Sequence, residues 1–257
     1  MGLDLAFSEF GSGTPVIIVH GLFGWKRNWA SIAKGLSEQH RVFTVDMRNH
    51  GESPHAPEMT YQDMAGDIAR FMDRHQLGPC PVIGHSMGGK ASMVLALSRP
   101  ERIERLLVLD IAPVPYEHDY SDYVIAMKNI DFSKVSRRSD VQPLIAEVAD
   151  DPGTQAFLMQ NLVTNSQGRY QWRVNLDAIE RHMSDILNFP EIRSEQAYTG
   201  PTLFLGGRRS DYIAPQYQSE IDRLFPSADV DFIDNASHWA HVDQPIAVLE
   251  RFRAFLK

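Results

Sequence analysis

The segment at residues 84–88, Gly-His-Ser-Met-Gly, constrains the fold of this chain more than any other. An apolar run, Cys80–Ile83, ends at its first glycine, and residues 90–98 carry Ala, Met, Val and Leu at helical spacing directly after it. A Gly-x-Ser-x-Gly pattern between a strand and a helix is typical of a nucleophile elbow, in which a sharp turn exposes the serine hydroxyl. Side chains two residues either side of that serine would crowd one another, and glycine avoids this. We therefore expect Ser86 to be a nucleophile at the N-terminal end of a helix, where the helix dipole favours negative charge.

Further apolar runs recur along the chain, and each is followed by a loop that is rich in glycine or polar residues. They cover residues 16–19, 41–45, 105–109, 201–205 and 230–233. Continuous runs of this kind are typical of parallel strands that are buried on both faces of a sheet. Helix-period segments lie between most of them, so the sequence predicts an α/β fold with a mostly parallel sheet flanked by helices. Loops at the carboxyl ends of such strands carry the functional site.

The alternation of strands and helices lapses after residue 111. The stretch that follows is too long for a loop, and Pro113, Pro115 and later aromatic and Met residues suggest several short helices. We expect residues 113–195 to form a helical cap inserted between two core strands, with residues 1–112 and 196–257 forming the core. A chain of 257 residues, 43% of them hydrophobic, can bury a core of that size.

The loop at residues 20–24, His-Gly-Leu-Phe-Gly, follows the strand expected at 16–19. A backbone N–H can approach a substrate oxygen closely only where neighbouring side chains are small, so this loop suits an oxyanion hole. We expect the backbone N–H groups of Leu22 and Met87 to bind the oxyanion. A plain turn between a strand and a helix is the alternative.

The loop at residues 46–53 is expected to be architectural. Its Asp46, Arg48 and Ser53 side chains can hydrogen-bond locally and hold the turn. Direct participation in catalysis is the alternative for this loop.

His238 is the expected base, because among ten histidines it alone lies in the loop just after the last expected strand, where a base must lie. His85 adjoins the serine in sequence and is expected to point elsewhere, while His241 is expected at the start of the last helix, Pro245–Phe255. The pair His238-x-x-His241 lacks the glutamate and the third ligand of a metal site, so no metal is expected. No cofactor is needed for nucleophilic catalysis by a serine.

Two aspartates compete to hold the imidazole of His238 in the right tautomer. Asp110 comes directly after the strand at 105–109, so we expect its position to be rigid. Asp211 lies in the loop after the strand at 201–205, which is the commonest place for the acid. In the usual spacing, however, Ser210 occupies the position of the acid, and Asp211 comes one residue later. We expect Asp110 to be the acid with Ser210 as its hydrogen-bonding neighbour, and Asp211 is the alternative.

The composition excludes some classes of partner. A net charge of −8 argues against nucleic acid and against an anionic membrane surface. No stretch is long and apolar enough to cross a membrane, and the first ten residues lack the apolar run of a signal peptide, so we expect a cytosolic protein. The one cysteine, Cys80, cannot form an internal disulfide. The oligomeric state does not follow from the sequence.

Several motifs together carry a resemblance to a known family. They are the elbow at 84–88, the loop at 20–24, Asp-Met-Arg-Asn-His-Gly-Glu-Ser at 46–53, Leu-Asp-Ile-Ala-Pro-Val at 109–114, and Asn-Leu at 161–162 with Trp-Arg-Val-Asn-Leu at 172–176. From about residue 3 to residue 257 the chain resembles the small cytosolic α/β-hydrolase esterases of the YbfF-like group. That group keeps Asp before Ile-Ala-Pro and has serine where the common acid would be, which also points to Asp110 and Ser210.

The resemblance implies an α/β-hydrolase fold and a serine hydrolase that cleaves carboxylic esters through an acyl-enzyme intermediate, with acyl-CoA thioesters as a second substrate class. Carbon–carbon bond hydrolysis, acyl transfer and elimination on the same serine are the rival reactions, and a ligand-binding receptor with slow turnover is a rival of another class. Two basic pairs, Lys26-Arg27 and Arg208-Arg209, follow expected strands. They could bind a phosphate of CoA, and a solvated surface is the alternative.

Overall fold

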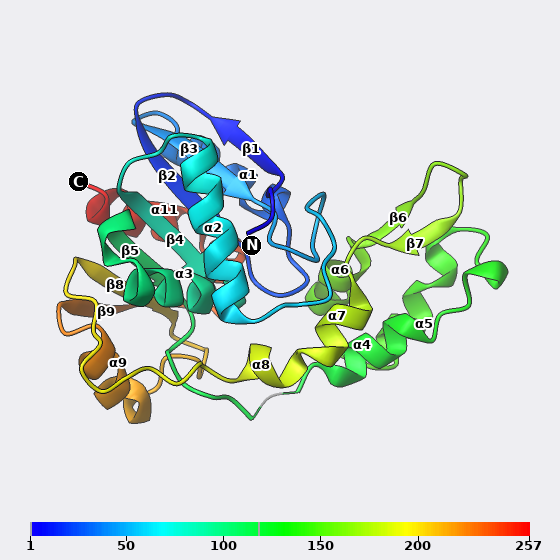
Figure 1. The fold of residues 1–257 in the computed structure, drawn as a ribbon. Coiled ribbons are helices and arrows are strands. Elements are labelled where there is room, and N and C mark those ends of the chain that lie inside the picture. The colour runs from blue at the N-terminus through cyan, green and yellow to red at the C-terminus, as the bar shows by residue number, and fades with distance from the viewer. Residues whose placement is uncertain (1, 118) are drawn as a thin grey trace.

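The computed structural model describes residues 2–117 and 119–257, which are organised around a seven-stranded sheet (Figure 1). The strands lie in the order β1-β3-β2-β4-β5-β8-β9. Strand β1 is antiparallel to β3, and the other neighbours are parallel. Their bounds are β1 Phe7–Phe10, β2 Thr14–Val19, β3 His40–Val45, β4 Cys80–His85, β5 Ile103–Leu109, β8 Thr202–Gly207 and β9 Ala228–Ile233. This mostly parallel sheet confirms the predicted fold class.

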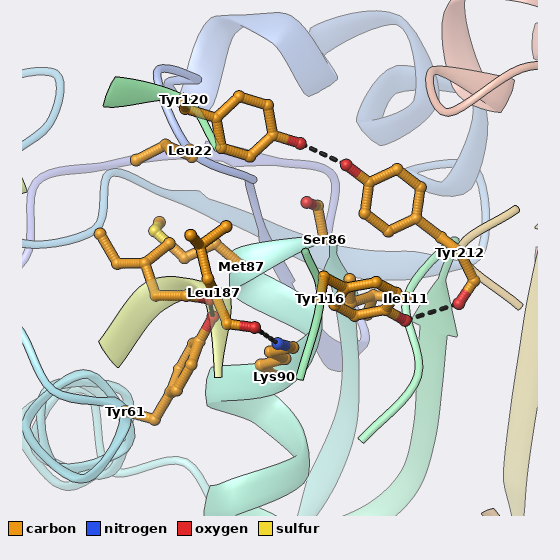
Figure 2. Close-up of a pocket in the computed structure, with 11 residues that line it drawn as sticks. Leu22, Tyr61, Ser86, Met87, Lys90, Ile111, Tyr116, Tyr120, Leu187 and Tyr212 are labelled. Atoms are coloured by element: carbon orange, nitrogen blue, oxygen red, sulfur yellow. Dashed lines mark hydrogen bonds between the residues drawn. The ribbon is translucent and has the colours of Figure 1, made fainter. Parts of the chain in front are cut away.

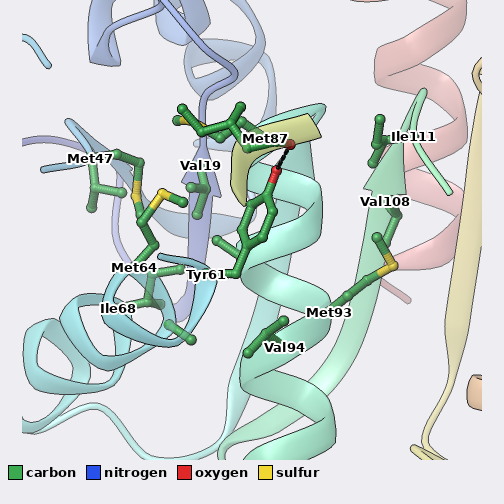
Figure 3. Close-up of a cluster of buried hydrophobic side chains, with 14 of the residues drawn as sticks. Val19, Met47, Tyr61, Met64, Ile68, Met87, Met93, Val94, Val108 and Ile111 are labelled. Carbon is green, nitrogen blue, oxygen red and sulfur yellow. Dashed lines mark hydrogen bonds between the residues drawn. The ribbon is translucent and has the colours of Figure 1, made fainter. Parts of the chain in front are cut away.

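Helices cover both faces of the sheet. They are α1 Ala30–Leu36, α2 Tyr61–Arg74, α3 Met87–Ser98, α9 Gln218–Leu224, α10 Ala240–Asp243 and α11 Pro245–Phe255. Because successive strand residues point to opposite faces, Ile17 and Val19 of β2 join one buried cluster, with α2 and α3, while Val16 and Ile18 join another, with α1 and α11. Figure 3 shows part of the first cluster. Burial on both faces explains why the strands read as unbroken apolar runs.

The terminal helix α11 has the predicted bounds, but one of its expected contacts is wrong. The helical spacing of the apolar residues Ile246, Leu249, Phe252 and Leu256 in the sequence predicts that they dock on the sheet. Phe252 and Leu256 are buried, yet Ile246 is 75% exposed. The buried stripe runs through Val248 and Phe252. Ile246 precedes Val248 by two residues, about 200° around a helix, so it faces away from the sheet.

The chain between β5 and β8 leaves the sheet and forms short helices and a hairpin (Figure 1). Its elements are α4 Ser121–Lys128, α5 Gln142–Ala146, α6 Pro152–Met159, β6 Leu162–Thr164, β7 Tyr170–Trp172, α7 Leu176–Arg181 and α8 Met183–Leu187. The short helices agree with the sequence pattern, while the hairpin β6–β7 adds a strand pair that was not predicted. No helix within residues 2–117 and 119–257 combines the length and the hydropathy needed to cross a membrane.

The predicted elbow is confirmed as a strand, a turn and a helix. Ser86 stands between β4 and α3 with φ +51° and ψ −122°, a strained conformation for a residue with a side chain. A Cβ on Gly84 would lie 2.5 Å from the Gly88 carbonyl oxygen, as the crowding argument predicts. A Cβ on Gly88 would instead lie 2.4 Å from the His20 carbonyl oxygen. The second glycine is therefore needed for the approach of α3 to the end of β2.

Gly84→Ala should destabilise the protein by about 1–3 kcal/mol, because its new Cβ meets backbone atoms that cannot rotate away. The matched control is Gly66→Ala on α2, where nothing lies within 4 Å of a new Cβ. That change should stabilise the protein by about 0.5–1 kcal/mol, since alanine favours a helix. Urea unfolding of both variants measures the two effects, and equal stabilities would contradict the steric argument.

Candidate active site

The candidate site forms where neighbouring parallel strands end. Ser86 follows β4, Asp110 follows β5, Ser210 follows β8, and His238 lies in the loop after β9. These four strands are consecutive in the sheet, so their carboxyl ends meet at one edge. The sheet order therefore brings together four residues that are up to 152 positions apart in sequence.

Ser86, His238 and Asp110 form a chain of hydrogen bonds. The imidazole Nδ1 of His238 lies 2.7 Å from Oδ2 of Asp110, and its Nε2 lies 3.1 Å from the Ser86 hydroxyl oxygen. Since the carboxylate can only accept, Nδ1 carries the proton and Nε2 is left to accept a proton from Ser86. This arrangement can deprotonate the serine as it attacks a carbonyl carbon.

The Asp110 carboxylate is fully buried and held by several donors. Its Oδ1 accepts a hydrogen bond from the Gly207 backbone N–H at 2.8 Å, and its Oδ2 accepts one from the Ser210 hydroxyl at 2.5 Å. These hydrogen bonds satisfy the carboxylate oxygens in a place that is closed to water. Among the described residues Asp110 is thus the acid that the structure brings to His238, while Asp211 is exposed.

Two neighbours of His238 were not singled out from the sequence as ring supports. The Tyr212 ring stacks on the imidazole with centroids 4.1 Å apart, and the His85 side chain donates from Nε2 to the His238 carbonyl oxygen at 2.8 Å. Burial lowers the pKa of His85 well below its usual value, so its ring is neutral. His85 therefore does not point away from the site as expected, but supports the backbone of the base.

His241 lies in the short helix α10 instead of at the start of α11. Its ring stacks on that of Trp29 with centroids 4.1 Å apart, and burial lowers its pKa to about 3. Among the described residues no group of three His, Cys, Asp or Glu side chains could hold a metal ion.

The loop at residues 20–24 is braced by two buried histidines. His20 accepts the Met47 backbone N–H at Nε2 and donates from Nδ1 to the Gly21 carbonyl oxygen. His50 in the same way accepts the Phe23 backbone N–H at Nε2 and donates from Nδ1 to the Arg48 carbonyl oxygen. Both rings are neutral in this arrangement, because each Nε2 faces a backbone donor. Burial lowers the pKa of both, that of His50 to about 3.

Leu22 and Met87 lie beside Ser86 and line a cavity with it (Figure 2). Met87 is the first residue of α3, and the first N–H groups of a helix have no partner within it. A Cβ on Gly21 would lie 3.1 Å from Cβ of Ser86, so the loop approaches the serine closely because residue 21 is glycine. Both predicted oxyanion donors thus belong to backbone that lies against the serine.

The loop at residues 46–53 holds its own turn, as expected. The Asp46 carboxylate accepts from the Glu52 backbone N–H, and the Ser53 hydroxyl donates to the Asp46 carbonyl oxygen. The Asp46 carboxylate also forms an ion pair with Lys26, with 2.8 Å between Oδ2 and Nζ, and that lysine is only 4% exposed. Lys26 is therefore a buried structural cation, and the idea that it binds a phosphate is wrong.

The second basic pair is engaged in surface contacts. Arg208 pairs with Asp234 at 3.3 Å, and Arg209 donates to the Asn235 carbonyl oxygen at 2.7 Å. Both side chains are exposed, which fits the solvated surface that was the alternative for this pair.

Two cavities flank Ser86. One extends along α3 and is lined by Met87, Lys90, Ile111 and Tyr116 (Figure 2). The other lies on the side of the base and is lined by Phe157, Leu158, His238 and Trp239. Leu22, Ser86 and Tyr120 line both cavities, so the serine stands between them.

Known proteins match the chain over nearly its whole length. Residues 14–245 match a family model described as alpha/beta hydrolase fold. The chain is 41% identical over 259 residues to sn-1-specific diacylglycerol lipase ABHD11 of Danio rerio, covering 98% of this chain and 81% of that protein. It is 35% identical over 246 residues to esterase YbfF of Escherichia coli K12, covering 95% and 94% of the two chains. A solved structure named marine microorganism esterase has a TM-score of 0.95 at 35% identity, covering 99% of this chain and 100% of that one.

The neutral His50 ring makes the stability of the protein depend on pH. Its pKa is about 3 in the folded protein and about 6.5 when unfolded, so the stability it contributes is present above pH 6.5 and is lost as the pH falls toward 3. His50→Gln keeps a donor and an acceptor but does not titrate. The variant should show a slope of unfolding free energy against pH, between pH 6 and 4, that is shallower by about 1.4 kcal/mol per pH unit.

Urea unfolding at several pH values measures that slope, and His55→Gln, at an exposed position, is the matched control for replacing a histidine. A slope for His50→Gln equal to that of the original protein would show that the ring is not buried in its neutral form.

Proposed function

The chain belongs to the α/β-hydrolase family, and from this premise we propose that Ser86 is the nucleophile that carries its ester hydrolysis. Relatives named lipase and esterase match along nearly the whole chain, and the resemblance to the YbfF-like group is confirmed. The protein is thus a carboxylesterase-type serine hydrolase. The single observation that carries the residue assignment is the hydrogen-bonded chain from Ser86 through His238 to the buried Asp110.

The reaction runs in two halves. Ser86 Oγ attacks the carbonyl carbon of the ester, and His238 Nε2 takes the hydroxyl proton. The bond to the alkoxy oxygen then breaks as Nε2 gives its proton to the leaving alcohol, which leaves an acyl group on Ser86. In the second half Nε2 takes a proton from water as the water attacks the acyl carbon, and returns it to Ser86 Oγ as the acid leaves. Asp110 keeps the ring in the tautomer with Nδ1 protonated and stabilises the imidazolium.

The negative oxygen of each tetrahedral intermediate is proposed to bind the backbone N–H groups of Leu22 and Met87. The close approach of Gly21 to Ser86 and the helical start at Met87 support this assignment. Each such donor contributes on the order of 10²-fold in rate, because it is already oriented toward the charge that develops.

The two cavities are proposed to receive different halves of the ester. His238 protonates the leaving alcohol, so that group must lie on the side of the base. The cavity on that side is lined by the apolar side chains of Phe157, Leu158 and Trp239, which suits an apolar alcohol. The cavity along α3 is left for the acyl group.

Residues 113–195 are proposed to act as a cap, with residues 1–112 and 196–257 as the core. The proposal is supported by the cavity linings, because Tyr116, Tyr120 and Leu187 complete the acyl cavity and Phe157 and Leu158 the other. Substrate selection would then depend on this segment, while the proposed catalytic groups lie on the core.

Oxygen esters are proposed in preference to acyl-CoA thioesters. The same serine chemistry serves both, but the basic residues suggested for a CoA phosphate have other partners. Lys26 is buried in an ion pair, Arg27 lies over the Trp25 ring with its Cζ 4.8 Å from the ring centroid, and Arg208 and Arg209 have surface partners. Among residues 2–117 and 119–257, no contact favours carbon–carbon bond cleavage, acyl transfer, elimination or slow-turnover binding. A cytoplasmic location, no nucleic-acid partner and no cofactor stay predictions from the sequence.

Ser86→Ala should lower kcat/KM for p-nitrophenyl butanoate by about 10⁴-fold or more, because the nucleophile and its base act as a unit. The fold should be kept, since the change removes a single oxygen. Ser98→Ala, at the other end of α3, is the matched control. Release of p-nitrophenol by folded protein measures the effect, and a Ser86→Ala variant with more than a tenth of the original activity would rule out Ser86 as nucleophile.

Asp110→Asn should lower kcat by about 10³- to 10⁴-fold, because an amide at this place favours the wrong tautomer of His238. Asp211→Asn, on the exposed neighbour of Ser210, should cost less than about tenfold, because the imidazole Nδ1 is bonded to Asp110 and the Asp211 side chain is exposed. The same assay ranks the two variants, and the reverse ranking would transfer the role of the acid to Asp211.

A further inference from the structure

Lys90 lies one helical turn after Ser86 and is almost fully buried. Its backbone N–H donates to the Ser86 carbonyl oxygen at 3.0 Å, and the whole residue is 1% exposed. Residues four apart on a helix share a face, so the lysine side chain lies below the serine in the same cavity (Figure 2). A cation therefore lies in the cavity proposed for the acyl group.

The surroundings of this cation are neutral. Its Nζ donates to the carbonyl oxygens of Leu187 and Asn188, both at 2.8 Å, and lies 4.8 Å from the Tyr116 ring centroid and 5.7 Å from that of Tyr61. Among the described residues no carboxylate lies within 4.0 Å of Nζ.

In the part of the chain that the structure describes, the other strongly buried Lys and Arg side chains are paired with acids. Lys26 pairs with Asp46 at 2.8 Å, and Arg48 pairs with Asp67 at 2.6 Å. A buried charge without a counter-ion is costly, and burial lowers the pKa of Lys90 to about 7. Lys90 is the exception among these cations, and it is the one that lines the cavity beside the serine.

We propose that Lys90 binds a carboxylate at the far end of the acyl group, so that the preferred substrates are half-esters of dicarboxylic acids. The proposal rests on the proposed function and names the acyl class that the site takes. An ammonium has three donors, and two of them go to the carbonyl oxygens of Leu187 and Asn188, so the third is proposed to bind the ligand. The arriving carboxylate supplies the counter-charge that the protein lacks at this place.

The hydroxyl groups of the neighbouring tyrosines already donate to backbone carbonyl oxygens, so Lys90 is the proposed donor to the carboxylate. The Tyr61 hydroxyl donates to the Ile186 carbonyl oxygen at 2.6 Å, and the Tyr116 hydroxyl donates to the Tyr212 carbonyl oxygen at 2.6 Å. Their rings form apolar walls around the ammonium. A charged hydrogen bond in such surroundings is stronger than one in water, and a neutral acyl end gains nothing comparable.

The test compares benzyl half-esters of succinate, glutarate and adipate with the benzyl esters in which the free carboxylate is replaced by a carboxamide of nearly the same shape. Release of benzyl alcohol gives kcat/KM for each ester. At one chain length or more, the original protein should prefer the carboxylate over the carboxamide by about 10- to 100-fold, the range for a hydrogen bond to a charged group.

Lys90→Met, which keeps the length of the side chain but removes the charge, should bring that ratio to about one. Lys90→Gln also removes the charge but keeps donors for a backbone carbonyl, so it should lose the preference as well. Lys34→Met, at an exposed position on α1, is the matched control and should keep the original ratio.

Absence of any carboxylate preference in the original protein would overturn the proposal, and that measurement depends on no variant. A preference that persists in folded Lys90→Met or Lys90→Gln would also overturn it. Lys90 would then have only a structural role, in which it connects α3 to residues 187–188 by hydrogen bonds. Failure to hydrolyse all of these esters and benzyl butanoate would instead overturn the proposed function, together with the inference that rests on it.

Discussion

The site depends on backbone hydrogen bonds that continue the sheet past the ends of its strands. Ser86 and Asp110 both have φ +51°, a conformation that residues with side chains rarely adopt. The N–H of Ser86 donates to the Leu109 carbonyl oxygen at 3.1 Å, and the N–H of Asp110 donates to the Leu205 carbonyl oxygen at 3.0 Å. Ser86 is thus fixed to the last residue of β5, and Asp110 is fixed to a residue near the end of β8. The rigid sheet can hold two strained turns side by side, which places the serine and the acid on opposite sides of one imidazole.

Two kinds of buried polar group stabilise the loops at residues 20–24 and 46–53. His20 and His50 are neutral, and each satisfies both ring nitrogens with backbone groups, so they fix the loop beside Ser86 without a buried charge. Lys26 and Arg48 are charged and have buried acids as partners. These groups explain why the loop at 46–53 matters to the site although it contributes no catalytic group. It presents Met47 and His50 to the loop that lies against the serine.

Tyrosines in the chain between β5 and β8 form hydrogen bonds with residues of the core. Tyr120 is hydrogen-bonded to Tyr212 through their hydroxyl groups (Figure 2). The Tyr212 ring in turn stacks on His238. Tyr116 accepts the Ala112 backbone N–H and donates to the Tyr212 carbonyl oxygen. The position of the proposed base is thus connected to the segment that lines the proposed substrate cavities.

The sequence by itself determined the parts of this protein that depend on neighbours along the chain. Unbroken apolar runs revealed strands buried on both faces, and Gly-x-Ser-x-Gly revealed the turn, because backbone crowding acts over a few residues. Asp110 could be preferred over Asp211 from its place at a strand end. Only the tertiary structure decided that Lys26 is buried, that Ile246 is exposed, that Tyr212 supports His238 and that Lys90 lacks an acid. Each of these depends on which distant segments approach one another, and burial in such contacts leaves no local pattern in the sequence.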